Sequence, residues 1–92
     1  MKLNTYMMKT SSGKPAPNQL VIEIGGHKFL KSYNSLVACV HADGTVEIGK
    51  DWNYSNTTRK FVTQFLGMSS KEIAKLETSD IQLYLDSWIH NS

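Results

Sequence analysis

The chain has 92 residues, of which 40% are hydrophobic and 20% are charged. This length fits a single domain over residues 1–92, and the composition is too apolar for a generally disordered chain. Ten basic and eight acidic residues give a net charge of +2, which excludes an acidic mimic of nucleic acid and is too small to indicate nucleic-acid binding by itself.

Targeting and redox signals are weak in this sequence. Residues 1–5 lack the apolar core and small-residue cleavage site of a signal peptide, and no stretch approaches the roughly 20 apolar residues of a membrane span. The single cysteine, Cys39, cannot form an internal disulfide. These features predict a cytoplasmic protein.

Residues 1–18 form the first predicted region, an N-terminal arm followed by a flexible loop. The apolar residues among the first nine fit either a short edge strand or an arm that binds a partner. Residues 10–18 are rich in Ser, Gly, Pro and Asn, a composition typical of exposed loops. Both a flexible linker and a functional loop remain open here.

Residues 19–50 are predicted to form a four-stranded antiparallel β-meander, because apolar residues alternate between turn signals. The expected strands are 19–24, 27–32, 35–42 and 45–50. A two-residue turn at Gly25-Gly26 fixes the first register. In that register Ile22 faces Phe29, Val21 faces Leu30, and Glu23 faces Lys28.

The second hairpin is predicted from Asp43-Gly44, a strong short-range turn signal. A two-residue turn at this position pairs Cys39 with Ile48, Val40 with Glu47, and His41 with Val46.

The chain is predicted to change from sheet to helix within residues 51–58, whose Asp, Asn, Ser and Thr side chains start helices. A first helix follows and ends at Gly67, and Ser69 with Glu72 has the spacing of a capping box. Whether residues 70–89 form two helices or one bent helix remains open. The expected fold is therefore α+β, a four-stranded meander followed by two or three helices, in residues 55–90, packed on one face.

Residue patterns that would carry chemistry are incomplete. Cys39 and His41 lie two residues apart on one strand, which favours core packing of the thiol over a Cys–His nucleophile pair. The histidines at 27, 41 and 90 do not have metal-site spacing. We therefore expect no catalytic residues, no metal and no cofactor, and a protein that is not an enzyme.

An aromatic and basic cluster surrounds the sheet-to-helix changeover. It is the predicted partner-binding site and comprises Trp52, Tyr54, Arg59, Lys60 and Lys50. Such residues form hot spots in protein interfaces and can stack on bases and neutralise phosphates. The alternative is that the two rings cover the core at this corner, with their polar tips outward.

Two segments carry a resemblance to known proteins. They are Lys31–Ala38 and Asp51–Phe61. Two shorter matches are Asp43-Gly44, which lies between these segments, and Phe65-Leu66-Gly67, which follows them. Over residues 31–67, and most specifically in the Trp-x-Tyr-Ser-x-Thr-Thr portion at 52–58, the chain resembles a family of small uncharacterised proteins from bacteriophages and their hosts. The resemblance implies a phage or mobile-element setting, in which small proteins often inhibit host defence systems such as CRISPR–Cas.

Three hypotheses about function follow. The leading one is a phage-type accessory protein that binds a host protein, such as a nucleic-acid-bound immune effector, and blocks it sterically in the bacterial cytoplasm. The second is a weak nucleic-acid-binding protein whose phosphate contacts are Lys28, Lys31, Lys50, Arg59 and Lys60. The third is an oligomeric small-molecule-binding protein with sites between chains, and a homodimer is left open.

Overall fold

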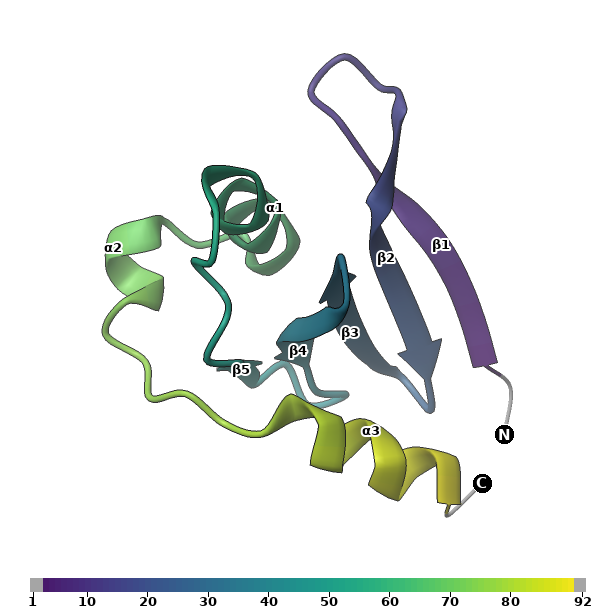
Figure 1. The fold of residues 1–92 in the computed structure, drawn as a ribbon. Helices are drawn as coiled ribbons and strands as arrows, with labels where there is room; N and C mark the ends of the chain where they lie inside the picture. The colour runs from purple at the N-terminus through teal and green to yellow at the C-terminus, as the bar shows by residue number, and fades with distance from the viewer. Residues whose placement is uncertain (1–2, 91–92) are drawn as a thin grey trace.

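The computed structural model describes residues 3–90, so Met1 and Lys2 of the predicted arm lie outside the described residues. The elements are β1 (Leu3–Lys9), β2 (Pro15–Ile24), β3 (His27–Ser32), β4 (Ser35–Val40), β5 (Val46–Ile48), α1 (Asn56–Leu66), α2 (Ser70–Ile73) and α3 (Ile81–His90). Within this range all strand pairs are antiparallel and the strands adjoin in chain order (Figure 1). The expected α+β fold with an antiparallel meander and C-terminal helices is confirmed.

The sheet has a fifth strand, which corrects the prediction of four strands after an arm and a loop. Residues 3–9 pair with β2 as an edge strand, and β2 itself begins at Pro15, inside the predicted loop. Pro15 and Pro17 are tolerated because β3 ends at Ser32, opposite Gln19, so this part of β2 has a strand on one side only. Figure 1 shows the β1–β2 hairpin projecting beyond the rest of the sheet.

The β2–β3 hairpin has the predicted register. Ile22 faces Phe29 and Glu23 faces Lys28, with 3.6 Å between the Lys28 Nζ and a Glu23 carboxylate oxygen. Gly25 and Gly26 both have positive φ, at 58° and 83°, as a two-residue turn matched to the strand twist requires.

The β4–β5 hairpin is shifted by one residue from the prediction, so Cys39 faces Glu47 and not Ile48. The loop contains Ala42 as well as Asp43 and Gly44, because the His41 N–H donates to the Thr45 carbonyl at 2.8 Å. A three-residue loop of this kind ends on a residue with positive φ, which is Gly44 at 89°. A one-residue shift exchanges the faces of a whole strand.

Helices cover both faces of the sheet, which corrects the prediction of one covered face. Successive strand residues point to opposite faces, and on β4 Ala38 packs with α1 and α2 while Cys39 packs with α3. Both faces of β3 and β4 are apolar, since Leu30 and Phe29 are each fully buried on opposite sides. The sheet therefore needs a helical layer on each side.

The C-terminal part contains three helices, so the residues after α1 form two separate helices and not one bent helix. Ser69 and Glu72 form the predicted capping box of α2, and Gly67 closes α1 with φ of 67°. Between α2 and α3 the chain runs beside β5, where Ser79 N–H donates to the Ile48 carbonyl at 2.8 Å. This contact carries the chain from one face of the sheet to the other.

Candidate binding site at the sheet-to-helix changeover

The turn between β3 and β4 presents an exposed tyrosine. Ser32 pairs with Ser35, so only Tyr33 and Asn34 remain to form the turn. Among the described residues, Tyr33 is the one non-glycine with positive φ, at 56°, a conformation that is uncommon and costly for a bulky side chain. The Tyr33 N–H donates to the Asn18 carbonyl at 2.8 Å, and the side chain is 49% exposed.

The changeover segment presents a second tyrosine. Its backbone turns twice, with the Trp52 N–H bonded to the Gly49 carbonyl and the Tyr54 N–H bonded to the Asp51 carbonyl, both at 3.1 Å. The turns send Trp52 into the core, at 8% exposure, and leave Tyr54 81% exposed. Ser55 then caps α1 by accepting the Thr58 N–H at 3.1 Å.

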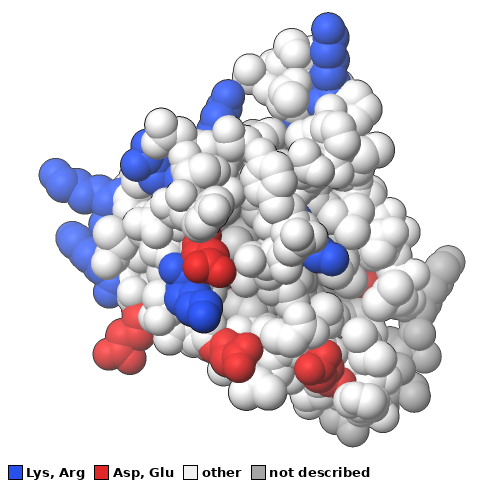
Figure 2. All heavy atoms as spheres, in the orientation of Figure 1, with Lys and Arg blue, Asp and Glu red and all other residues white. Residues whose placement is uncertain are grey.

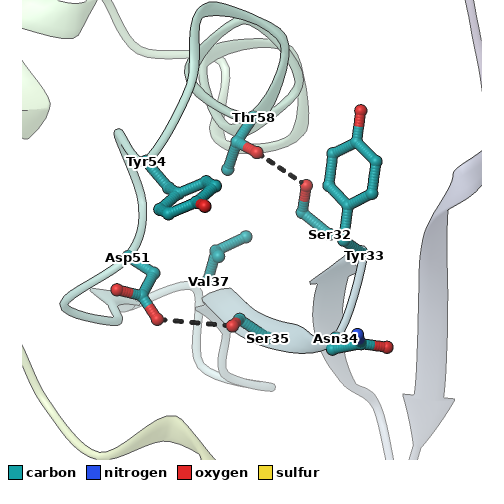
Figure 3. A pocket seen from close by; sticks show the side chains of 8 residues that line it. All are labelled: Ser32, Tyr33, Asn34, Ser35, Val37, Asp51, Tyr54 and Thr58. Atoms are coloured by element: carbon teal, nitrogen blue, oxygen red, sulfur yellow. Dashed lines mark hydrogen bonds between the residues drawn. The ribbon is translucent and has the colours of Figure 1, made fainter.

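A pocket of about 320 Å³ lies between these two segments, and we call it the tyrosine pocket (Figure 3). Its lining residues are Ser32, Tyr33, Asn34, Ser35, Val37, Asp51, Tyr54 and Thr58. Figure 3 shows Tyr54 and Tyr33 on opposite sides, with Val37 between them. Ser35 Oγ donates to Asp51 Oδ2 at 3.3 Å. All eight residues fall within residues 31–38 and 51–61.

Buried and partly buried polar side chains support the pocket where α1 begins. Ser32 and Thr58 share a buried hydroxyl contact of 3.0 Å, and Ser55 Oγ donates to Thr58 Oγ1 at 3.1 Å. Gln19, opposite Ser32 on β2, is buried with an Oε1 that has no partner among the described residues. The hydroxyl contacts attach the start of α1 to β3 and so fix the width of the pocket.

The structure separates the five predicted partner-binding residues. Trp52 belongs to the core, whereas Tyr54, Lys50, Arg59 and Lys60 are exposed. Of these, Tyr54 lines the tyrosine pocket, and Lys50 lines an adjoining hollow of about 500 Å³.

Charge is distributed unevenly around this region. Arg59 Nη2 donates to Asn56 Oδ1 at 2.9 Å on the surface of α1. Figure 2 shows Lys and Arg side chains mainly over the upper and left part of this face, where α1, α2 and the tip of the β1–β2 hairpin lie, and Asp and Glu side chains along the lower part. Of the predicted basic residues, Lys50 lines the adjoining hollow, and neither Arg59 nor Lys60 is among the residues that line the tyrosine pocket.

Sequence reasoning missed the contribution of Tyr33 and Asp51 to a site. The available signal was the gap of two residues between the strands predicted to end at 32 and begin at 35, which forces a tight turn. The joining of that turn to Asp51 depends on the path of the chain after β5, which no local pattern encodes.

The second concentration of functional groups lies under α3, and we call it the Glu47 cluster (His27, Cys39, His41, Glu47 and Tyr84). One oxygen of the Glu47 carboxylate accepts a hydrogen bond from the His41 ring. The other oxygen accepts hydrogen bonds from the Ser79 and Tyr84 hydroxyls, each at 2.9 Å. Partial burial opposes ionisation, but these hydrogen bonds outweigh it and lower the pKa of Glu47. The carboxylate joins β5 to α3.

The thiol in this cluster is not set up as a nucleophile. Cys39 is fully buried, and its Sγ lies 4.0 and 3.9 Å from the two ring nitrogens of His41, beyond the reach that proton transfer requires. Burial, followed by the charge of Glu47, raises the pKa of the thiol to about 12. The prediction that Cys39 packs in the core is confirmed.

His27 completes the cluster as a packing residue. Its ring stacks on Trp88 of α3 at a centroid distance of 4.0 Å, and its Nδ1 accepts the Ala42 N–H at 3.1 Å. Burial, followed by the proximity of His41, lowers the pKa of His27. The unprotonated ring is therefore the form that fits under α3.

Residues 3–90 contain neither a cluster of metal ligands nor a helix that could span a membrane. No group of three or more His, Cys, Asp or Glu in this range could hold a metal ion. None of the helices in the same range is long and apolar enough to cross a membrane.

Comparison with known proteins identifies a family. The family described as "Family of unknown function (DUF8033)" matches residues 1–82, and the chain belongs to it. The match includes all residues of the tyrosine pocket and the whole sheet. Comparisons with curated proteins and with solved structures returned no match.

Proposed function

We propose that the protein acts by binding another protein through the tyrosine pocket and the exposed residues beside it. The observation that carries this proposal is the pair of exposed rings, Tyr33 and Tyr54, held on opposite sides of one pocket. Tyrosine supplies a large, rigid contact area at low cost in side-chain entropy, and it is enriched among interface hot spots.

The partner in this proposal is a host defence effector, such as a CRISPR–Cas complex, which the protein blocks sterically in a phage setting. The support is the resemblance of residues 31–67 to small phage proteins, together with a site built for contact. Lys50 lines the adjoining hollow, and the exposed Arg59 and Lys60 follow Thr58 of the pocket in the chain. Exposed basic side chains speed encounter with an acidic surface. On this proposal the protein is not an enzyme.

Nucleic-acid binding is less well supported by the arrangement of charges. Lys28 is paired with Glu23 and lies on β3 in the middle of the sheet. The described residues lining the tyrosine pocket include a carboxylate, Asp51, and no basic side chain, which is unfavourable beside phosphates. Nucleic-acid binding remains an outcome that the experiment below detects.

The test is capture from bacterial lysate on the immobilised protein, followed by an activity assay of the captured effector. We compare the wild type with the double variant Tyr54→Ala and Arg59→Ala. Truncating a hot-spot tyrosine costs about 2 kcal/mol of binding energy, so we expect affinity to fall by roughly 30-fold or more. Leu83→Ala is the matched control, because Leu83 is 65% exposed on α3, away from the pocket.

Two results would contradict the proposal. One is the absence of any stoichiometric protein partner. The other is capture by the double variant that is as strong as capture by the wild type and by the Leu83→Ala control. Binding to DNA or RNA that weakens steeply with salt, without a protein partner, would favour the nucleic-acid hypothesis.

A further inference from the structure

The tyrosine pocket combines two aromatic rings with one negative charge. Among the described residues that line it, Asp51 has the only charged side chain, and the others are hydroxyl, amide, aromatic or aliphatic. The one side-chain donor that the structure gives Asp51 is Ser35, which bonds Oδ2 at 3.3 Å. A carboxylate accepts several hydrogen bonds, so Oδ1 retains acceptor capacity toward a ligand.

The two rings add a second preference for positive charge. The face of a tyrosine ring carries a negative potential that attracts ammonium and guanidinium groups, and aromatic cages for such cations are built from rings around a small pocket. Tyr33 and Tyr54 lie on opposite sides of this pocket (Figure 3). The volume of about 320 Å³ is at the lower end of the range of roughly 300–1,000 Å³ for ligand pockets and suits one side chain.

Backbone strain indicates that the position of Tyr33 is not set by folding alone. A positive φ in a two-residue turn favours Gly or Asn, yet the chain has tyrosine there at φ of 56°. Such strain is unfavourable for folding and is often found in ligand-binding segments. Because nearly half of the Tyr33 side chain is exposed, core packing does not explain the choice of residue.

We propose that the tyrosine pocket binds an alkylammonium or guanidinium group, namely the end of a Lys or Arg side chain presented by the protein partner. This inference rests on the proposed function for the source of the cation. The cation sits between the rings of Tyr33 and Tyr54 with its charge toward Asp51. An anion is disfavoured by the same carboxylate, and Lys50, Arg59 and Lys60 do not line the pocket.

The first experiment measures the chemistry of the pocket without a partner. The full chain is titrated with n-butylguanidinium and with tetramethylammonium, followed by amide chemical shifts in two-dimensional NMR spectra. We expect saturable shifts confined to residues 32–37 and 51–58, with weak affinity, because a cation–π contact at an exposed site contributes little binding energy. Butyrate and glucose serve as anionic and neutral probes and should cause no such shifts.

Variants then test whether the Asp51 carboxylate and the Tyr33 ring each contribute to cation binding. Asp51→Asn keeps an oxygen that can accept from Ser35 and removes the charge, so we expect cation affinity to fall at least five-fold. Asp80→Asn is the matched control, because Asp80 lines the adjoining hollow and not the tyrosine pocket. Tyr33→Gly removes one ring and should raise the Tm while weakening cation binding, a combination that damage to the fold cannot produce.

The outcomes separate this inference from the proposed function. Cation binding with loss in Asp51→Asn supports the inference. If the captured protein is also released by n-butylguanidinium, the cation comes from a partner side chain. If cations bind and no protein partner is found, the pocket takes a free cation and the proposed function fails.

The inference is overturned if butyrate or glucose binds in place of the cations, or if neither cationic probe shifts the pocket. It is also overturned if Asp51→Asn captures the partner as well as the wild type, in which case the proposed function stands without it.

Discussion

The tyrosine pocket and the Glu47 cluster lie against opposite faces of β4 and are built from similar residue types. Both contain a tyrosine, a carboxylate and hydroxyl groups. In the Glu47 cluster both carboxylate oxygens accept from the protein itself, and Tyr84 donates its hydroxyl to one of them. In the tyrosine pocket Asp51 accepts from one side chain and Tyr54 is 81% exposed.

This difference indicates which polar groups serve the fold and which are available to a ligand. A hydrogen bond made within the protein stabilises the folded state and leaves little capacity for another molecule. We therefore assign the Glu47 cluster to the docking of α3, and our proposal places ligand binding in the tyrosine pocket. The predictions below change one region or the other and measure whether stability or binding responds.

The largest expected effect is at Gly49, where the two regions meet. A Cβ at this position would lie 2.6 Å from the Leu36 carbonyl oxygen and 3.5 Å from Ile81 of α3, and backbone cannot move aside as a flexible side chain can. Gly49→Ala should cost about 3 kcal/mol or more of unfolding free energy, measured by urea denaturation. Gly13→Ala is not a suitable control because its φ is positive, so we use Ala74→Gly, at the exposed end of α2. A Gly49→Ala loss below that of the control would contradict the close approach.

Removing Glu47 should have the next largest effect. Glu47→Ala leaves His41, Ser79 and Tyr84 without their shared acceptor, and hydrogen bonds to charged groups contribute about 1.5–3 kcal/mol. We expect a loss of roughly 2 kcal/mol at pH 7 by urea denaturation and faster hydrogen exchange in α3. Glu77→Ala, an exposed carboxylate between α2 and α3, should change stability by less than about 0.5 kcal/mol. Equal losses of unfolding free energy in the two variants would contradict a structural role for the Glu47 cluster.

The pH dependence of stability provides a third measurement. The pKa of His27 is lowered, by burial and then by His41, so the unfolded chain binds a proton more readily than the folded chain. The contribution of His27 to stability is therefore fully present above the pKa of histidine in the unfolded chain, about 6.5. It is lost as the pH falls below that value. The lowered pKa of Glu47 adds a further loss in more acidic solution, below the ordinary glutamate range.

His27→Gln separates the two contributions to this pH dependence. The substitution should flatten the stability curve between pH 7 and pH 5.5 and leave the more acidic loss from Glu47. Unfolding free energies at several pH values check this, with His90→Gln as a control because His90 lies at the exposed end of α3. A protein that becomes more stable on acidification would refute the assignment.

The sequence predicted the local features of the fold well and its long-range features poorly. Gly25-Gly26 fixed a register that the structure reproduces, because a two-residue turn leaves no freedom in pairing. At Asp43-Gly44 the same reasoning failed by one residue, since Asp43 Oδ1 accepts from the Thr45 N–H at 3.0 Å and the loop takes in Ala42. That shift placed Glu47 opposite Cys39 and so created the Glu47 cluster.

The candidate site was predicted only in part. The aromatic residues at the changeover were found, but Trp52 and Tyr54 could not be separated, because burial depends on turns whose direction is set by Gly49 and Asp51. Tyr33 was outside the predicted site because the turn that carries it comes to face the changeover segment only when β4 and β5 pair. Local patterns encode turns and caps, and the meeting of two distant turns is a property of the assembled sheet.

The smallest expected effect gives the most direct comparison of the two regions, because the same atom is removed from each. Tyr84→Phe deletes a hydroxyl that donates to Glu47 at 2.9 Å, and Tyr54→Phe deletes one for which the structure gives no partner among the described residues. We expect Tyr84→Phe to lower the Tm measurably and Tyr54→Phe to leave it unchanged within about 1 °C. Both variants should retain cation binding, because Tyr54→Phe keeps its aromatic ring and Tyr84 does not line the tyrosine pocket. A lower Tm for Tyr54→Phe than for Tyr84→Phe would reverse the assignment, because the hydroxyl at the pocket would then be the one that serves the fold.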